Sequence, residues 1–79
     1  MPTVLRQDGF HVVVYVKDHG PPHHVHVFGG GGEARIRIED GAVMDAWRMG
    51  ESKLQAAVML VWRHREQLLE AWERIHGHG

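Results

Sequence analysis

The segment EARIRIE at residues 33–39 decides the fold, because charged and apolar residues alternate along its whole length. In an extended chain, Ala34, Ile36 and Ile38 would lie on one side and the charged residues on the other. This period of two predicts a half-buried β-strand whose apolar side faces a core. The dipeptide Asp40-Gly41 follows directly and predicts a hairpin turn, since glycine accepts the positive φ that such turns need.

Similar short segments precede this strand. Residues 3–6, 10–16 and 24–28 are rich in β-branched and aromatic residues and predict three more strands. Both sides of segment 10–16 are partly apolar, which indicates a central position in the sheet. Asp8-Gly9 and the four glycines at 29–32 predict turns, and residues 42–44 predict a short final strand. The sequence therefore predicts an antiparallel β-meander of four to five short strands between about residues 3 and 44.

The hydrophobic period changes after this sheet. Spacings of three and four residues connect Leu54, Val58, Val61, Leu68, Trp72 and Ile75. This pattern predicts one long amphipathic C-terminal helix over residues 52–76, roughly 36 Å in length at 1.5 Å per residue. Arg65 interrupts the apolar stripe, Ser52 is the expected N-cap and Gly77 the expected end.

These elements predict a single small α+β domain over residues 1–79, with the helix packed on one sheet face. The other face is left to solvent, to a ligand or to a second copy, so a homodimer is one open alternative. Trp72 lies on the helical stripe, and we expect it in the core. Trp47 belongs either to the core or to a lid, and we favour the core. Trp62 lies beside the stripe and either widens the buried face or meets a partner. Glu70 and Arg74 have the spacing of a helix-supporting ion pair.

Composition narrows the classes of function. The chain has 79 residues, 43% of them hydrophobic, which is typical of a folded globular domain. Its net charge of −1 does not indicate nucleic-acid binding. The local cluster Arg63-His64-Arg65, with Arg74, either contacts phosphates or, as we favour, forms a solvated helix face. The absence of cysteine excludes disulfides, thiolate zinc sites and cysteine nucleophiles. With no secretory signal pattern and no membrane-spanning apolar run, we expect a soluble cytoplasmic protein without membrane contact.

The histidine-rich run DHGPPHHVH at residues 18–26 is the candidate site. In a strand, His24 and His26 share one face, and the proline pair could fold His19 back toward them. Three imidazoles, with Asp18 or His23 as further candidate ligands, suit a transition metal such as zinc or nickel. The alternative is a set of exposed histidines with no common partner, which would bind metal only adventitiously.

A second interpretation is acid–base catalysis. His19, His24 or His26 could transfer a proton near neutral pH while Arg35 or Arg37 stabilises a phosphate, as in a toxin-like ribonuclease. The sequence lacks the carboxylate cluster of a two-metal nuclease. The glycines at 29–32 lead into a strand, so they are not a phosphate-binding loop. The residues leave the reaction open, and we favour binding over catalysis.

Several motifs together resemble a known family. They are MPTVLR at 1–6, DHGPPHHVHV at 18–27, Glu33-Ala34, LLEAW at 68–72 and Ile75-His76-Gly77. The chain is similar to a widespread family of small bacterial proteins that is catalogued as a domain of unknown function and shows the motif Asp-His-x-Pro-Pro-His-x-His-Val. This chain has two histidines, His23 and His24, where the family has one, and which of them fills the family position is open.

The resemblance implies a setting for the protein. Genes of this family often neighbour, or fuse to, another small domain, and a toxin–antitoxin role has been suggested for such pairs. We therefore expect a binding module of a two-gene system, with a small protein encoded by the neighbouring gene as its partner.

Overall fold

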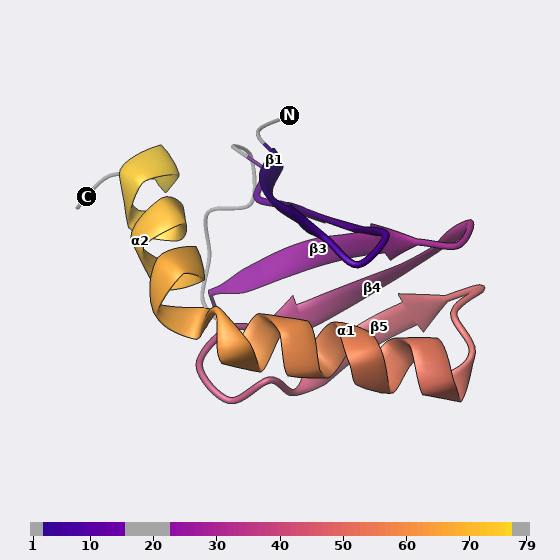
Figure 1. Ribbon diagram of the computed structural model, residues 1–79. Coiled ribbons are helices and arrows are strands. Elements are labelled where there is room, and N and C mark those ends of the chain that lie inside the picture. The colour runs from indigo at the N-terminus through magenta and orange to yellow at the C-terminus, as the bar shows by residue number, and fades with distance from the viewer. Residues whose placement is uncertain (1–2, 16–22, 77–79) are drawn as a thin grey trace.

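The protein folds into one antiparallel sheet and two helices (Figure 1). The computed structural model describes residues 3–15 and 23–76. The strands are β1 (Thr3–Gln7), β2 (Phe10–Val13), β3 (His24–Gly29), β4 (Gly32–Arg37) and β5 (Val43–Trp47), and the helices are α1 (Glu51–Arg63) and α2 (Arg65–His76). The strands lie side by side in chain order, each antiparallel to the next. The predicted α+β class and β-meander are confirmed.

The turns form where the sequence predicts them. Asp8 and Gly9 connect β1 to β2 with φ values of 54° and 81°, and Gly30 and Gly31 connect β3 to β4 with 57° and 81°. Two successive positive φ values are those of the tight turn that matches the twist of a hairpin. Gly41 also has positive φ, and its N–H donates to the Arg37 carbonyl at 2.9 Å.

The core lies between α1 and one face of the sheet. The predicted inward residues Ala34, Ile36 and Ile38 are fully buried, and β2 lies between β1 and β3 as expected of a central strand. The buried cluster contains Phe10, Val12, Val14, Val25, Val27, Ala34, Ile36, Ile38, Ala57, Leu60, Val61, Leu68 and Trp72. Trp72 is therefore a core residue, as predicted.

The prediction of a single long helix is wrong. The helix breaks at His64, whose φ of −109° and ψ of 20° are not helical, next to the Arg65 that interrupts the apolar stripe. Figure 1 shows α1 lying along the sheet and α2 turning away to stand at its end. A straight helix of roughly 36 Å would overhang strands of about 20 Å. The bend instead buries Leu68, Ala71 and Trp72.

Three smaller predictions also need correction. Gly50, not Ser52, is the N-cap of α1, and no side-chain hydrogen bond caps the N-terminus of this helix. The final strand β5 covers residues 43–47 rather than 42–44. Trp47 ends that strand and is 52% exposed, so it does not belong to the core. The predicted Glu70–Arg74 pair is present, with 3.9 Å between Oε1 and Nη2.

Within residues 3–15 and 23–76, the structure contains no helix with the length and apolar character needed to cross a membrane.

Candidate functional site

The sheet face opposite α1 carries the polar side chains. Side chains alternate along a strand, and residues paired across two strands share a face. The strand register therefore places these polar side chains on one face and the buried apolar side chains on the other. The register pairs His24 with Arg37, His26 with Arg35 and Arg35 with Asp45. We call this surface the histidine face; it also carries His11, Val13, Phe28, Glu33 and Trp47.

His26 and Glu33 form the central contact of the histidine face. Nδ1 of His26 lies 3.0 Å from Oε2 of Glu33, and the His26 side chain is only 12% exposed. The ring of Tyr15 meets the His26 ring edge-on, with centroids 4.4 Å apart. When Nδ1–H donates to the carboxylate, Nε2 is the nitrogen that carries the lone pair for a metal or a proton.

His24 lies next to His26, as the sequence predicts. The ring centroids are 5.4 Å apart and the ring planes are inclined by 63°. Two imidazoles bound to one tetrahedral zinc ion through nitrogens at about 2.0–2.1 Å have ring centres roughly 5 Å apart. The spacing of the two rings is therefore compatible with a shared metal ion.

The other predicted ligands are not placed with this pair. Asp18 and His19 lie outside the described residues. His23 packs on Trp72, with ring centroids 5.2 Å apart, and its backbone carbonyl accepts from Ile38 N–H at 3.0 Å. In the part of the chain that the structure describes, no three histidine, aspartate or glutamate side chains are grouped to hold a metal ion.

Both predicted phosphate-binding arginines pair with carboxylates. Arg35 forms an ion pair with Asp45 on β5. Arg37 donates to both carboxylate oxygens of Asp40, from Nε at 2.8 Å and from Nη2 at 2.6 Å. Hydrogen bonding to Arg37 lowers the pKa of Asp40 to about 2, and the same contact raises the pKa of Arg37. The arginine charges of this face are therefore largely balanced within the protein.

Trp72 supports the histidines from α2. Besides His23, its ring contacts His24, at 5.4 Å between centroids, and His76, at 4.1 Å. The sequence predicts Trp72 as a core residue but not as the neighbour of the histidine run. The contact arises because the break at His64 brings α2 to the end of the sheet where β3 begins.

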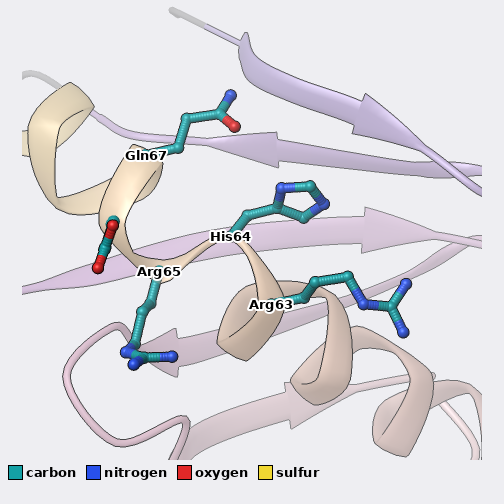
Figure 2. A pocket seen from close by; sticks show the side chains of 5 residues that line it. Arg63, His64, Arg65 and Gln67 are labelled. Atoms are coloured by element: carbon teal, nitrogen blue, oxygen red, sulfur yellow. The ribbon is translucent and has the colours of Figure 1, made fainter.

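A second group of polar residues, three of them basic, lies at the junction of the two helices. Arg63, His64, Arg65, Glu66 and Gln67 line a hollow of about 420 Å³ (Figure 2). Figure 2 shows that the labelled side chains point in different directions instead of converging on one point. The Arg65 guanidinium lies 4.2 Å from the centroid of the Trp62 ring and donates to the Trp62 carbonyl at 3.3 Å. This arrangement does not form a phosphate site of the kind left open by the sequence.

Comparison with models of protein families finds a match for the chain. A model of a domain of unknown function, DUF4160, matches residues 9–73. The chain belongs to the DUF4160 family. The match includes β3, β4 and most of α2, and so it covers every residue of the histidine face from His11 to Trp47. Comparisons with curated proteins and with solved structures found no significant match.

Proposed function

We propose that this DUF4160 protein is a small cytoplasmic binding module that holds a transition-metal ion, of the zinc or nickel class, on its histidine face. His24 and His26 would be the central ligands, with His19 and Asp18 as the candidates to complete the site. The observation that supports the proposal best is the pair of adjacent imidazoles, one of which is oriented by Glu33.

The surroundings of the pair support metal binding in two ways. A carboxylate that accepts from the far ring nitrogen fixes the tautomer and raises the basicity of a metal-binding histidine. Tyr15 packs against the His26 ring and Trp72 against the His24 ring, and these contacts restrict the rotation of the two rings. Such preorganisation lowers the entropy lost when the side chains close on an ion.

Isothermal titration of the tag-free protein with zinc and with nickel tests the proposal. We expect one site, with affinity lost in the double variant His24→Ala/His26→Ala and weakened in His19→Ala. His11→Ala is the matched control, because His11 is an exposed histidine on the same face, across from Phe28. Equal affinity in the wild type and the double variant would overturn the metal site.

A ribonuclease is the second candidate function. The His26–Glu33 pair has the arrangement of a general base held by a carboxylate, and this observation favours acid–base chemistry. The pairing of Arg35 with Asp45 and of Arg37 with Asp40 argues against it, since both candidate phosphate ligands are already engaged. Cleavage of single-stranded RNA by the wild type, abolished by His26→Ala and retained in His11→Ala, would favour the enzyme over the binding module.

The two-gene setting is also a proposal, and it rests on the resemblance to the family. We expect the product of the neighbouring gene to bind this protein. Co-expression of the two genes, with a tag on the neighbour only, should recover both proteins in one complex. Recovery of the tagged neighbour alone would contradict this partnership.

A further inference from the structure

An apolar surface lies on the outer side of α1, beside the start of β5. Met59, Trp62 and Val43 are 55%, 44% and 41% exposed. Val43 and Met59 line a hollow of about 290 Å³ together with the half-buried Leu54 and Val58 and the polar residues Glu51 and Gln55. We call Val43, Leu54, Val58, Met59 and Trp62 the α1 patch.

The α1 patch is continuous and borders the core, against which Leu54 and Val58 are packed. Leu54, Val58 and Trp62 follow one another at intervals of four residues, so they form one stripe along the helix. Gly41 lies beside this stripe, because a Cβ added there would be 3.6 Å from Val58 and 4.0 Å from Trp62. The buried residues of α1 are Ala57, Leu60 and Val61, whereas Met59 and Trp62 are exposed. A helix whose apolar stripe is only partly covered by its own domain is typical of an interaction surface.

We infer that a second copy of this chain covers the α1 patch, with the two α1 helices packed antiparallel about a two-fold axis near Val58. The charges at the ends of α1 favour this occupant. Glu51 lies in the first turn and Arg63 in the last turn. Antiparallel packing brings each Glu51 near the second copy's Arg63, and a two-fold axis makes both ion pairs at once. The helix dipoles are also opposed in this arrangement.

The helices, and not the edge of the sheet, would make this contact. β5 is an edge strand, but its pairing with β4 shifts register between Arg35 and Ile36. Such an irregularity at an edge disfavours pairing with another strand. The dimer also suits a domain of 79 residues, because so small a core gains much from additional apolar burial.

Sedimentation equilibrium of the tag-free chain of 79 residues tests the proposal. We expect a monomer–dimer equilibrium over a concentration series. Met59→Lys should raise the dimer dissociation constant at least about tenfold, since a buried methionine is lost from each side. Trp47→Lys is the matched control, because Trp47 is equally exposed but lies outside the α1 patch. A wild type that stays monomeric throughout, or a Trp47→Lys variant that dissociates as readily as Met59→Lys, would overturn the inference.

Charge reversal tests the antiparallel arrangement. Glu51→Arg and Arg63→Glu should each weaken self-association about tenfold, because each places like charges together twice in the dimer. An equimolar mixture of the two variants should form a heterodimer more readily than either variant forms a homodimer, since both pairs are then attractive. No preference for the heterodimer would overturn the antiparallel packing. Far-UV circular dichroism confirms that each variant is folded.

Discussion

His26 and Glu33 lie diagonally across neighbouring strands, with Nδ1 and Oε2 3.0 Å apart. The register places His26 directly opposite Arg35 and Glu33 directly opposite Phe28, so the two side chains meet across the β3–β4 hairpin. Through this contact the carboxylate determines which imidazole nitrogen donates a proton and which carries a lone pair. Glu33 therefore acts on any ligand of His26 through the ring, without touching the ligand itself.

We predict that Glu33→Gln weakens zinc affinity about tenfold to 100-fold, which is the usual effect of removing a carboxylate that orients a metal-binding histidine. Glutamine preserves the size of the side chain and can still accept a hydrogen bond, so the effect isolates the negative charge. Calorimetric titration of the tag-free protein measures it. Glu39→Gln, an exposed position just beyond β4, should leave the affinity unchanged. Equal losses in the two variants would point to a general charge effect instead.

Much of the sheet could be predicted because its signals are local. The alternation of residues 33–39 and the glycines of the turns each depend on neighbouring residues only. The break between α1 and α2 is harder to predict from the sequence. Arg65 marked the interruption of the stripe, but the bend itself arises because Leu68, Ala71 and Trp72 must reach the end of a sheet that is shorter than a straight helix.

The candidate site was predicted only in part for the same reason. That His24 and His26 share a face follows from the period of a strand. The carboxylate partners of His26, Arg35 and Arg37 depend on which side-chain conformations form across the hairpins. The spacing of residues in the sequence does not determine these conformations. A tryptophan between two elements is usually buried, but β5 extends to Trp47 and leaves it exposed at the end of the strand, which the sequence does not predict.

Trp72 is expected to be a principal determinant of stability. It is 4% exposed and contacts three histidines. Truncation of a buried tryptophan to alanine removes about 3–5 kcal/mol from the free energy of unfolding. A domain of this size has little more than that, so we expect Trp72→Ala to be largely unfolded by far-UV circular dichroism.

Trp72→Phe is the milder substitution, and its free energy of unfolding can be measured. It retains an aromatic ring on the histidines, and we expect a folded protein with a lower urea midpoint and an unchanged slope. Trp47→Ala, at an exposed tryptophan, should change the free energy of unfolding by less than about 0.5 kcal/mol. A Trp72→Phe variant as stable as the wild type would contradict close packing at this position.

The Arg37–Asp40 contact predicts a specific pH dependence. The pKa of Asp40 is about 2, below its ordinary value of 3.8, chiefly because Arg37 donates hydrogen bonds to the ionised carboxylate. The ionised group therefore stabilises the folded chain above the ordinary value, and this contribution is lost as pH falls through about 2. We predict that Arg37→Gln raises the Asp40 pKa toward 3.8, while the Ala42 N–H, which donates at 3.0 Å, keeps it somewhat low.

Carbon-detected NMR titration of the Asp40 carboxyl measures this shift. Arg6→Gln removes a positive charge from β1, at the opposite edge of the sheet from the β4–β5 turn, and should leave the Asp40 pKa unchanged. An Asp40 pKa that stays at about 2 in Arg37→Gln would show that Arg37 is not the cause.

Gly32 has the closest backbone approach in the hairpin that carries Glu33. A Cβ added to Gly32 would lie 2.3 Å from the Arg48 carbonyl oxygen and 2.9 Å from that of Trp47. Both obstacles are backbone atoms at the end of β5, so neither can rotate aside. We predict that Gly32→Ala lowers the free energy of unfolding by roughly 1–3 kcal/mol, measured by urea denaturation. Because Glu33 follows directly in β4, the same displacement should also weaken zinc binding.

Gly50→Ala is the control for this prediction. No atom lies within 4 Å of a Cβ added there, and φ at Gly50 is −65°, which any residue adopts. The loss of glycine at a helix N-cap should change stability by less than about 1 kcal/mol and leave zinc binding intact. If both variants had the same midpoint and the same zinc affinity, the destabilisation would come from the loss of glycine in general. If only Gly32→Ala lost both, the close packing of the β3–β4 hairpin against the end of β5 would be what holds Glu33 beside His26.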